Sequence, residues 1–347
     1  MNDKKLTTIY DIAEHVEMTP TTVSRVLNNK GYISDKTRKK VLKAAKQLNY
    51  KPNLVARSLK TGETKQIILA MPFINEMFNF DFITTIQQGV QSKGYSLLLR
   101  YTDAKSDEEI KTIESLAMNN ADALILLVID ITNELLEVLS EARRPCVLVF
   151  FNSYSERDLP VDFVSIDSRK GIYMAANHLI KQGHTELGYI GPSFETSEGR
   201  ERYKGFCEAM EENSLPIDQE LVFNGTYTEL FGYQCGVAMC ESGKKATAIC
   251  AASDLIALGL YRAFEQFDVR IPQDVCIVGM DNTDVCTIVK PKLSSVAMLQ
   301  EELSRCSVET IFEYLDGDKD MSGHIVKHIT YEPRLVIRDS SVVFNSR

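Results

Sequence analysis

Thr19-Pro-Thr-Thr-Val-Ser-Arg-Val-Leu-Asn28 has the composition of a short helix with a polar cap at its start. Thr19 is a natural N-cap, and Pro20 suits the first helical position because its missing N–H has no intrahelical partner to lose. One face of this helix is apolar and the other is polar. The apolar face carries Val23, Val26 and Leu27, and the polar face carries Thr21, Thr22, Ser24 and Arg25. Such a helix can pack on a small domain through its apolar side and insert its polar side into a DNA groove.

Two more helices are predicted around this stretch. Thr8 with Asp11 three residues later approximates a capping box, and the apolar residues after it have helical spacing up to Val16. Ser34 can cap a third helix that runs to about Leu48. Its predicted inward positions are Val41, Leu42, Ala45 and Leu48. Residues 1–50 therefore predict a helix-turn-helix domain, although any small helical bundle with a basic face has a similar pattern.

Length and charge indicate a basic head on a larger acidic body. A chain of 347 residues is long enough for two or three compact units. Residues 1–60 contain 13 Lys+Arg and 5 Asp+Glu, a net +8, whereas the remainder has 26 and 43, a net −17. This asymmetry predicts that only the head meets a polyanion such as DNA.

The composition predicts a cytoplasmic protein. The polar start Met-Asn-Asp-Lys-Lys does not resemble a secretory signal, and no apolar run approaches the roughly 20 residues of a membrane span. The eight cysteines are scattered and form no C-x-x-C pair, so we expect them to be reduced. We therefore expect no membrane association.

From residue 66 onward, short apolar runs alternate with amphipathic stretches. Strands are predicted at 67–73, 96–101, 123–129, 146–151, 164–167, 187–191, 248–251 and 275–280. Helices are predicted at 82–92, 107–119, 133–142, 171–182, 201–213, 231–241 and 255–267. This alternation predicts two parallel, doubly wound sheets that divide near 161–167. Ligands of such sheets bind beyond the carboxyl ends of the strands.

No motif in the body indicates catalysis or a cofactor. The sequence has no phosphate-binding loop and no G-x-G-x-x-G after a strand. His178 and His184 have no cysteine or carboxylate at ligand spacing, and His324 with His328 lack an evident third ligand. We expect no metal site, no cofactor and no enzymatic activity.

Five stretches of the head resemble the N-terminal signature of the LacI/GalR family of bacterial transcription repressors. They are Thr8–Val16, Thr22–Asn29, Ser34–Val41, Leu48–Asn53 and Ala56–Lys60. The resemblance implies that Pro20, Thr21 and Arg25 read base edges in the major groove, where the planar fork of arginine can bond guanine O6 and N7 together. It also implies phosphate contacts, which fix register, from Thr8, Tyr10, Thr22, Ser24, Asn28 and Tyr32.

Residues 51–61 resemble the hinge helix of the same family. The resemblance implies that this segment folds on operator DNA, pairs with its twin from a second subunit and lies in the minor groove. Leu59 matches the leucine that inserts between base pairs and kinks the duplex. Val55 and Ala56 would form the contact between the two hinges, with Arg57 and Lys60 near phosphates. A homodimer is therefore expected, with a tetramer left open.

The body resembles the effector domain of the family, a periplasmic-binding-protein type 1 fold. The matching stretches are Gly183–Gly191, Arg202–Phe206, Ser253–Gly259, Ile271–Asp281 and Leu293–Val296. The resemblance implies a domain over 62–347, with lobe one at about 62–163 and 294–323 and lobe two at about 164–293 and 324–340. It implies effector contacts from Phe82, Ile83, Asp130, Phe151, Arg202, Tyr227, Asp254 and Asp281.

This residue set predicts a neutral, polyhydroxylated ligand. Hydroxyls can donate to Asp130 and Asp281 and accept from Arg202, while an aromatic ring stacks on the C–H face of a sugar. By residue type alone, Asp130 could equally cap the next helix, and the aromatic residues could belong to the core. Purine-binding members of the family have an arginine where this chain has Thr196, which favours a sugar.

The expected function is a transcriptional repressor that binds a pseudo-palindromic operator and is released by a small molecule. The expected small molecule is a sugar, acting as the inducer of a carbohydrate-utilisation operon. Two alternatives stay open. One is a repressor that depends on a purine corepressor, and the other is a solute-binding receptor that does not bind DNA.

Overall fold

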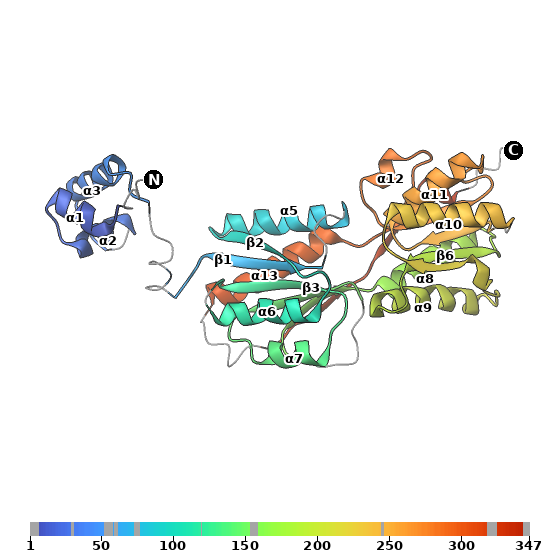
Figure 1. Ribbon diagram of the computed structural model, residues 1–347, viewed down its shortest axis with the longest axis horizontal. Helices are drawn as coiled ribbons and strands as arrows, with labels where there is room; N and C mark the ends of the chain where they lie inside the picture. The colour runs from blue at the N-terminus through green and yellow to red at the C-terminus, as the bar shows by residue number, and fades with distance from the viewer. Residues whose placement is uncertain are drawn as a thin grey trace, which may run out of the picture. The chain divides into compact units, whose positions relative to one another are not determined.

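The computed structural model describes residues 7–28, 31–51, 58, 62–72, 77–118, 120–152, 159–243, 246–317 and 325–342, with only the backbone of 77–79. The chain divides into two compact units, Met1–Thr64 and Lys65–Arg347. We call the first unit the head and the second the body. Each is described separately (Figure 1).

The described residues of the head form three helices, each with a side-chain cap. They are α1 (Ile9–Val16), α2 (Pro20–Leu27) and α3 (Asp35–Gln47). Thr8 and Asp11 form a complete capping box, because Thr8 Oγ1 accepts from the Asp11 N–H and the Asp11 carboxylate accepts from the Thr8 N–H at 2.6 Å. Thr19 caps α2 and Ser34 caps α3 in the same way. All three helix starts were predicted from the sequence.

The head buries a small apolar core made by one face of each helix. Its members are Ile12, Ala13, Val16, Val23, Val26, Val41 and Ala44. Leu42 was predicted to face inward, and that prediction was wrong, since its side chain is 49% exposed. Val41 and Ala44 are three residues apart and share the inward stripe, whereas Leu42 is rotated by about 100° from Val41.

The described residues of the body form two six-stranded sheets. In spatial order the first consists of β11 (His328–Tyr331), β5 (Asp162–Ile166), β4 (Cys146–Phe150), β3 (Ala123–Val128), β1 (Gln66–Met71) and β2 (Ser96–Tyr101). The second consists of β12 (Arg334–Val336), β10 (Ser294–Ala297), β9 (Cys276–Asp281), β8 (Ala248–Ala251), β6 (Leu187–Pro192) and β7 (Val222–Gly225). All pairings are parallel except that of β10 with β12. Two doubly wound lobes are therefore confirmed.

Helices cover both faces of each sheet (Figure 1). In lobe one, α5 (Met77–Ser92) and α13 (Gln300–Asp316) cover one face, and α6 (Ser106–Ala117) and α7 (Asn133–Ser140) cover the other. In lobe two, α8 (Ser168–Lys181) and α9 (Ser197–Glu212) lie opposite α10 (Glu229–Ser242) and α11 (Asp254–Gln266). The described part of the body also contains the short helical elements η1 (Gln219–Leu221), α12 (Val285–Ile288) and η3 (Asp339–Ser341).

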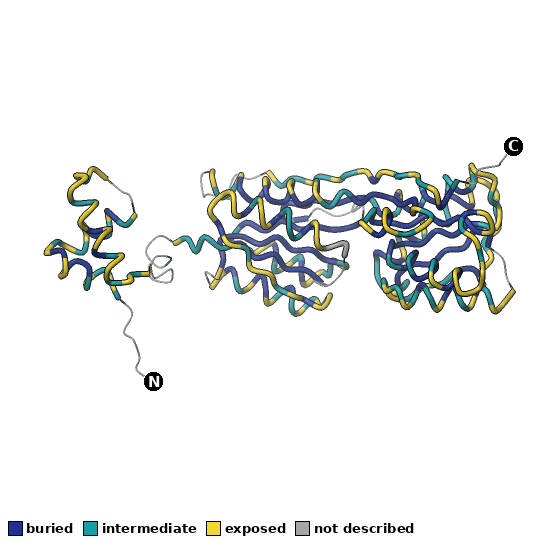
Figure 2. The backbone as a smooth tube through the Cα atoms, turned by 90° about the horizontal axis from the view of Figure 1, so that it is seen from above, coloured by how far each residue is buried: buried dark blue, intermediate teal, exposed yellow. Residues whose placement is uncertain are grey.

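Alternate residues of the inner strands pack on opposite layers, so the strands are buried on both sides. Ile67, Leu69 and Met71 of β1 join the cluster that contains α5 and α13, whereas Ile68 and Ala70 join the one under α6 and α7. Figure 2 shows the buried stretches running along the sheets and the exposed ones along the helices. This pattern explains why the central strands read as continuous apolar runs in the sequence.

The chain passes between the lobes three times. It leaves lobe one after β5, returns from β10 to α13, and crosses again between β11 and β12. The predicted lobe boundaries place 294–323 in lobe one and 324–340 in lobe two, but β10 lies in the second sheet and β11 in the first. Strands of four residues at a crossover carry no pattern that tells which sheet they join.

Candidate DNA-binding and effector sites

The polar face of α2 is available for contact with DNA. Thr21 and Arg25 are exposed, and Pro20, Thr22 and Ser24 are half-buried at the same helix. Among the described residues, no ion pair engages the Arg25 guanidinium. Val23 and Val26 hold the opposite face in the core. The helix therefore presents one arginine fork and several hydroxyls on a rigid support, as base and phosphate recognition requires.

Some of the predicted phosphate-contacting side chains are exposed, and others form hydrogen bonds within the head. Tyr10 and Tyr32 project from the head, with Tyr32 fully exposed. The Asn28 amide donates to Ser24 O at 2.8 Å and so completes the end of α2. Thr8 is engaged in the capping box of α1. The predicted hinge residues Val55, Ala56, Arg57, Leu59 and Lys60 lie outside the described residues.

The centre of the predicted effector site is Arg202 on α9. Its side chain is only 4% exposed, its Nη2 donates to Glu198 Oε1 at 2.5 Å, and its Nη1 donates to Ala252 O at the end of β8. The guanidinium carbon lies 5.1 Å from the centre of the Tyr227 ring, within cation–π range. Burial lowers the pKa of Arg202, but Glu198, Tyr227 and Asp281 outweigh it and raise that pKa. Arg202 and Tyr227 therefore lie in contact, and the charge of Asp281 acts on the same guanidinium.

Asp281 and Asp254 lie at neighbouring strand ends but differ in how they are used. Asp281 ends β9 with a positive φ of 112°, and its main-chain oxygen accepts from Gln300 Nε2 at 2.9 Å. The Asp254 carboxylate accepts from Ser295 Oγ at 2.6 Å, from Thr283 N and Oγ1, and from Cys286 Sγ. Its approach depends on Gly279, because a Cβ there would lie 2.4 Å from Asp254 Oδ1. Asp254 thus ties α11 to β9 and β10 rather than offering free acceptors to a ligand.

The aromatic residues predicted in lobe one belong to its core. Phe82 is completely buried, and its main-chain oxygen accepts from Ser304 Oγ of α13 at 3.1 Å. Phe151 is also buried, and Ile83 is half-buried against the same cluster. The ring of Phe82 has no face open for stacking on a ligand in this arrangement. Tyr227, which is half-buried, is the better placed ring.

Asp130 joins the two lobes. Its carboxylate accepts from the Ser197 N–H at 2.9 Å, and Ser197 Oγ donates to Ile129 O at 3.1 Å. Ser197 is the first residue of α9, so the carboxylate sits at a helix N-terminus, where negative charge is favoured. Nearby on α6, burial and then the charge of Asp130 raise the pKa of Glu109 to about 7.

Three residues of this region were not predicted from the sequence: Glu198, Ser197 and Glu109. Glu198 had a detectable signal, because it lies four residues before Arg202 and so shares a helix face with it. Ser197 and Glu109 had no such signal. Ser197 bonds to Asp130 and Glu109 is affected by the charge of Asp130, and both lie far from Asp130 in the sequence.

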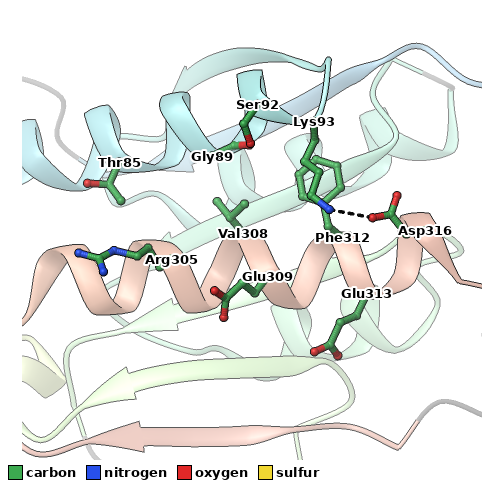
Figure 3. A pocket seen from close by; sticks show the side chains of 10 residues that line it. All are labelled: Thr85, Gly89, Ser92, Lys93, Arg305, Val308, Glu309, Phe312, Glu313 and Asp316. Carbon is green, nitrogen blue, oxygen red and sulfur yellow. Dashed lines mark hydrogen bonds and ion pairs between the residues drawn. The ribbon is translucent and has the colours of Figure 1, made fainter.

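A separate groove lies on lobe one between α5 and α13 (Figure 3). Its volume is about 580 Å³, and none of the predicted effector residues lines it. The Lys93–Asp316 ion pair of 3.0 Å closes one end, with the Lys93 ammonium 5.3 Å from the centre of the Phe312 ring. The groove is thus a surface feature distinct from the strand-end site.

Within the described ranges, no cluster of three or more metal-binding side chains occurs. Over the same residues, every helix is too short or too polar to cross a bilayer.

Comparison with known proteins identifies both units. Residues 8–53 match the model of bacterial regulatory proteins of the lacI family, and residues 176–341 match a periplasmic binding protein-like domain. The HTH-type transcriptional regulator DegA of Bacillus subtilis is 32% identical over 345 residues, covering 98% of this chain and 99% of its own. The HTH-type transcriptional repressor PurR of Haemophilus influenzae is 31% identical, covering 96% of this chain and 98% of its own.

Solved structures share the architecture. A LacI-family regulator from Silicibacter pomeroyi superposes with a TM-score of 0.83 at 25% identity, covering 96% of this chain and 99% of its own. The lac repressor dimer bound to operator and the anti-inducer ONPF superposes with a TM-score of 0.85 at 22% identity, covering 98% of this chain and 100% of its own. This likeness shows the fold. With its helix-turn-helix head and its effector domain, the chain therefore belongs to the LacI family and is a DNA-binding transcriptional repressor.

Proposed function

We propose that the repressor binds a pseudo-palindromic operator as a homodimer and responds to an uncharged, hydroxyl-rich effector such as a sugar. The observation that carries the effector class is the set of groups at the strand ends of lobe two. Arg202 supplies donors, Asp281 supplies an acceptor, and Tyr227 supplies a ring next to the guanidinium. Ligands with many hydroxyls use donors and acceptors of this kind together.

On DNA, Arg25 would supply the main base-specific contact of α2, with Thr21 beside it and Pro20 limited to apolar contact. Leu59 would insert into the minor groove, where unstacking costs a few kcal/mol and is offset by added contact surface. Specificity would then depend on the deformability of the duplex as well as on Arg25. Such a target would place the protein in the cytoplasm.

An exposed edge supports the homodimer. The outer strand β2 carries Leu98, Leu99 and Tyr101, all substantially exposed. Long edge strands with exposed apolar side chains are rare in monomers, because they invite pairing with another chain. A second copy of the body is the partner that symmetric operator binding requires.

Release would depend on two arrangements of the lobes. An effector can shift the equilibrium only if it binds one arrangement more tightly than the other. The Asp130–Ser197 hydrogen bond joins the lobes beside the site, so a ligand there can change the free energy of their closure.

A purine effector is the second candidate, and the similarity to PurR repressors favours it. Other relatives favour a sugar, since the transcriptional regulator CelR was solved with cellobiose, with a TM-score of 0.70, and an Enterococcus faecium regulator was solved with ribose. In this chain Thr196, which stands where purine-binding members have an arginine, caps α9 through Gly199 N at 3.1 Å.

Two measurements test the proposal. Operator DNA is selected from a random duplex pool, and its binding is followed by fluorescence anisotropy at several salt concentrations. We expect a steep salt dependence, and binding that is weak and insensitive to salt would refute the DNA function. A thermal-shift screen with sugars and purine bases then identifies the effector, because a ligand of the native state raises Tm. A shift with purine bases alone would replace the sugar with the purine alternative.

A further inference from the structure

The charge at the centre of the effector site is balanced by the protein itself. Glu198 and Arg202 are one turn apart on α9, and Arg202 Nη2 lies 2.5 Å from Glu198 Oε1. Both residues are buried, at 8% and 4% exposure. A buried ion pair of this kind is held in place, because removing either partner leaves an uncompensated charge away from water.

This pairing limits what Arg202 can offer to a ligand. Nη1 donates to Ala252 O and Nη2 donates to Glu198, whereas the buried Nε has no hydrogen-bond partner among the described residues. Phosphates and carboxylates are bound most strongly by a guanidinium that presents two parallel N–H groups. Of the five N–H groups of an arginine, two are engaged here; the pairing with Glu198 balances the charge that an anion would use, whereas the other N–H groups can still donate to a hydroxyl or a carbonyl oxygen.

The surrounding charges also disfavour an anion. The negative charge of Asp281 acts on Arg202 together with that of Glu198. Two carboxylates thus act on one guanidinium, and an incoming phosphate or carboxylate would be repelled.

We propose that Glu198 determines the charge class of the effector: it neutralises Arg202, so that the site accepts uncharged polar ligands and excludes phosphorylated or carboxylated ones. The proposal rests on the proposed location of the effector site, but not on the effector being a sugar. An anionic ligand would either meet a guanidinium whose charge Glu198 already balances or displace the Glu198 carboxylate and leave it buried without a partner, whereas an uncharged ligand can bind beside the intact pair.

The chain contains a matched control for the effect of removing such a pair. Glu301 and Arg305 on α13 have the same four-residue spacing and the same 2.5 Å contact, but both side chains are 61% exposed. The variant Glu301→Gln therefore removes a glutamate from a helical pair without changing the effector site.

The test uses the full-length protein and inorganic phosphate as the anionic probe, with chloride at equal ionic strength as the reference. Binding is measured by isothermal titration calorimetry and by thermal shift. We expect Glu198→Gln to bind phosphate at least about tenfold more tightly than the wild type, because the freed guanidinium can then pair with the anion. Glu301→Gln should behave as the wild type, and Arg202→Ala combined with Glu198→Gln should lose the gain. A merely structural role of Glu198 would not produce new anion binding.

Equal phosphate binding by the wild type and Glu198→Gln would overturn the proposal. If Glu198→Gln does not fold, the wild type still provides a test with neutral sugars and their phosphates. An anionic compound that raises Tm of the wild type, and does so only when Arg202 is present, would refute the role of Glu198. A neutral purine that raises Tm would contradict the proposed sugar but leave the role of Glu198 standing, so the two failures are distinguishable.

Discussion

The main-chain N–H of Ser197 donates to the Asp130 carboxylate at 2.9 Å, and this contact joins α9 of lobe two to the end of β3 in lobe one. A second hydrogen bond, from Ser197 Oγ to Ile129 O, runs parallel to it. Together with the three passages of the chain, these two hydrogen bonds connect the lobes beside the proposed effector site. Hydrogen bonds of this kind contribute about 1 kcal/mol each, or somewhat more when one partner is charged.

Asp130→Ala should weaken effector binding by favouring separated lobes. We expect a loss of about 1–2 kcal/mol in binding free energy, from the charge-assisted bond. Titration of the effector found in the thermal-shift screen measures the loss. Ser140→Ala, which removes a hydroxyl bonded within its own helix, is the control. An unchanged effector affinity in Asp130→Ala would show that the contact does not take part in closure.

The raised pKa of Glu109 predicts that the free energy of unfolding depends on pH. Burial and the charge of Asp130 raise its pKa to about 7, against 4.5 for an ordinary glutamate. The folded state therefore holds the proton more tightly than the unfolded state. This contribution to the free energy of unfolding is fully present below pH 4.5 and is lost as the pH rises to about 7.

Glu109→Gln should remove this dependence. Relative to the wild type, the variant should gain about 1–3 kcal/mol of stability between pH 5 and pH 8. Chemical denaturation at both pH values measures the difference. Glu114→Gln, on the exposed face of the same helix, should show the same change in the free energy of unfolding with pH as the wild type. If Glu109→Gln also shows the same change, Glu109 is already ionised in the folded protein.

Arg25→Ala should weaken operator binding by about 1–3 kcal/mol and relax the base preference at one position of each half-site. The physical reason is the loss of a bidentate contact to a base edge. Binding to a set of single-base operator variants measures both effects. Lys39→Ala, on the exposed face of α3, should leave the base preference as it is. If Arg25→Ala lowers affinity equally for all sequences, Arg25 contacts phosphate instead.

Asp281→Ala should abolish the effector-induced rise in Tm, because it removes an acceptor from the site. The Tm without effector should change little, and a large drop would show that Asp281 is needed for the fold.

Asp254→Ala should lower the stability of the body by about 3 kcal/mol or more, because the donors around the carboxylate lose their acceptor. Those donors are Ser295 Oγ, Thr283 N and Oγ1, and Cys286 Sγ. Chemical denaturation gives the free energy of unfolding. A loss of stability no larger than that of an ordinary surface substitution would contradict the structural role that we assign to the Asp254 hydrogen bonds.

The sequence predicted the elements that have strong local signals. The three caps at Thr8, Thr19 and Ser34 marked the helices of the head, and eight strands of the two lobes were predicted from their apolar runs. The short strands β7, β10, β11 and β12 were not predicted, although β10 is buried. The long helix α13 was not predicted. Its buried face includes Ser304, Ser307 and Thr310, whose hydroxyls bond to carbonyl oxygens, so the helix does not look amphipathic.

The candidate site was only partly predictable for a related reason. Arg202, Tyr227 and Asp281 matched family positions, and the structure brings them together. The engagement of Asp254 by Thr283, Ser295 and Cys286 depends on residues some 30 to 40 positions away. Local sequence carries no signal for such contacts, and it therefore could not separate ligand groups from structural ones.

The three passages of the chain between the lobes have a consequence for biosynthesis. During translation, the first sheet still lacks β11 and the second still lacks β10 and β12 when residue 293 has been added. Neither lobe can be completed from a contiguous piece of the nascent chain, and α13 must also be made before lobe one is covered. A premature stop anywhere before His328 would thus leave both lobes unfinished, whereas the head could already have folded around its own small core. Fragments that end early are therefore expected to retain a DNA-binding head without a working effector domain.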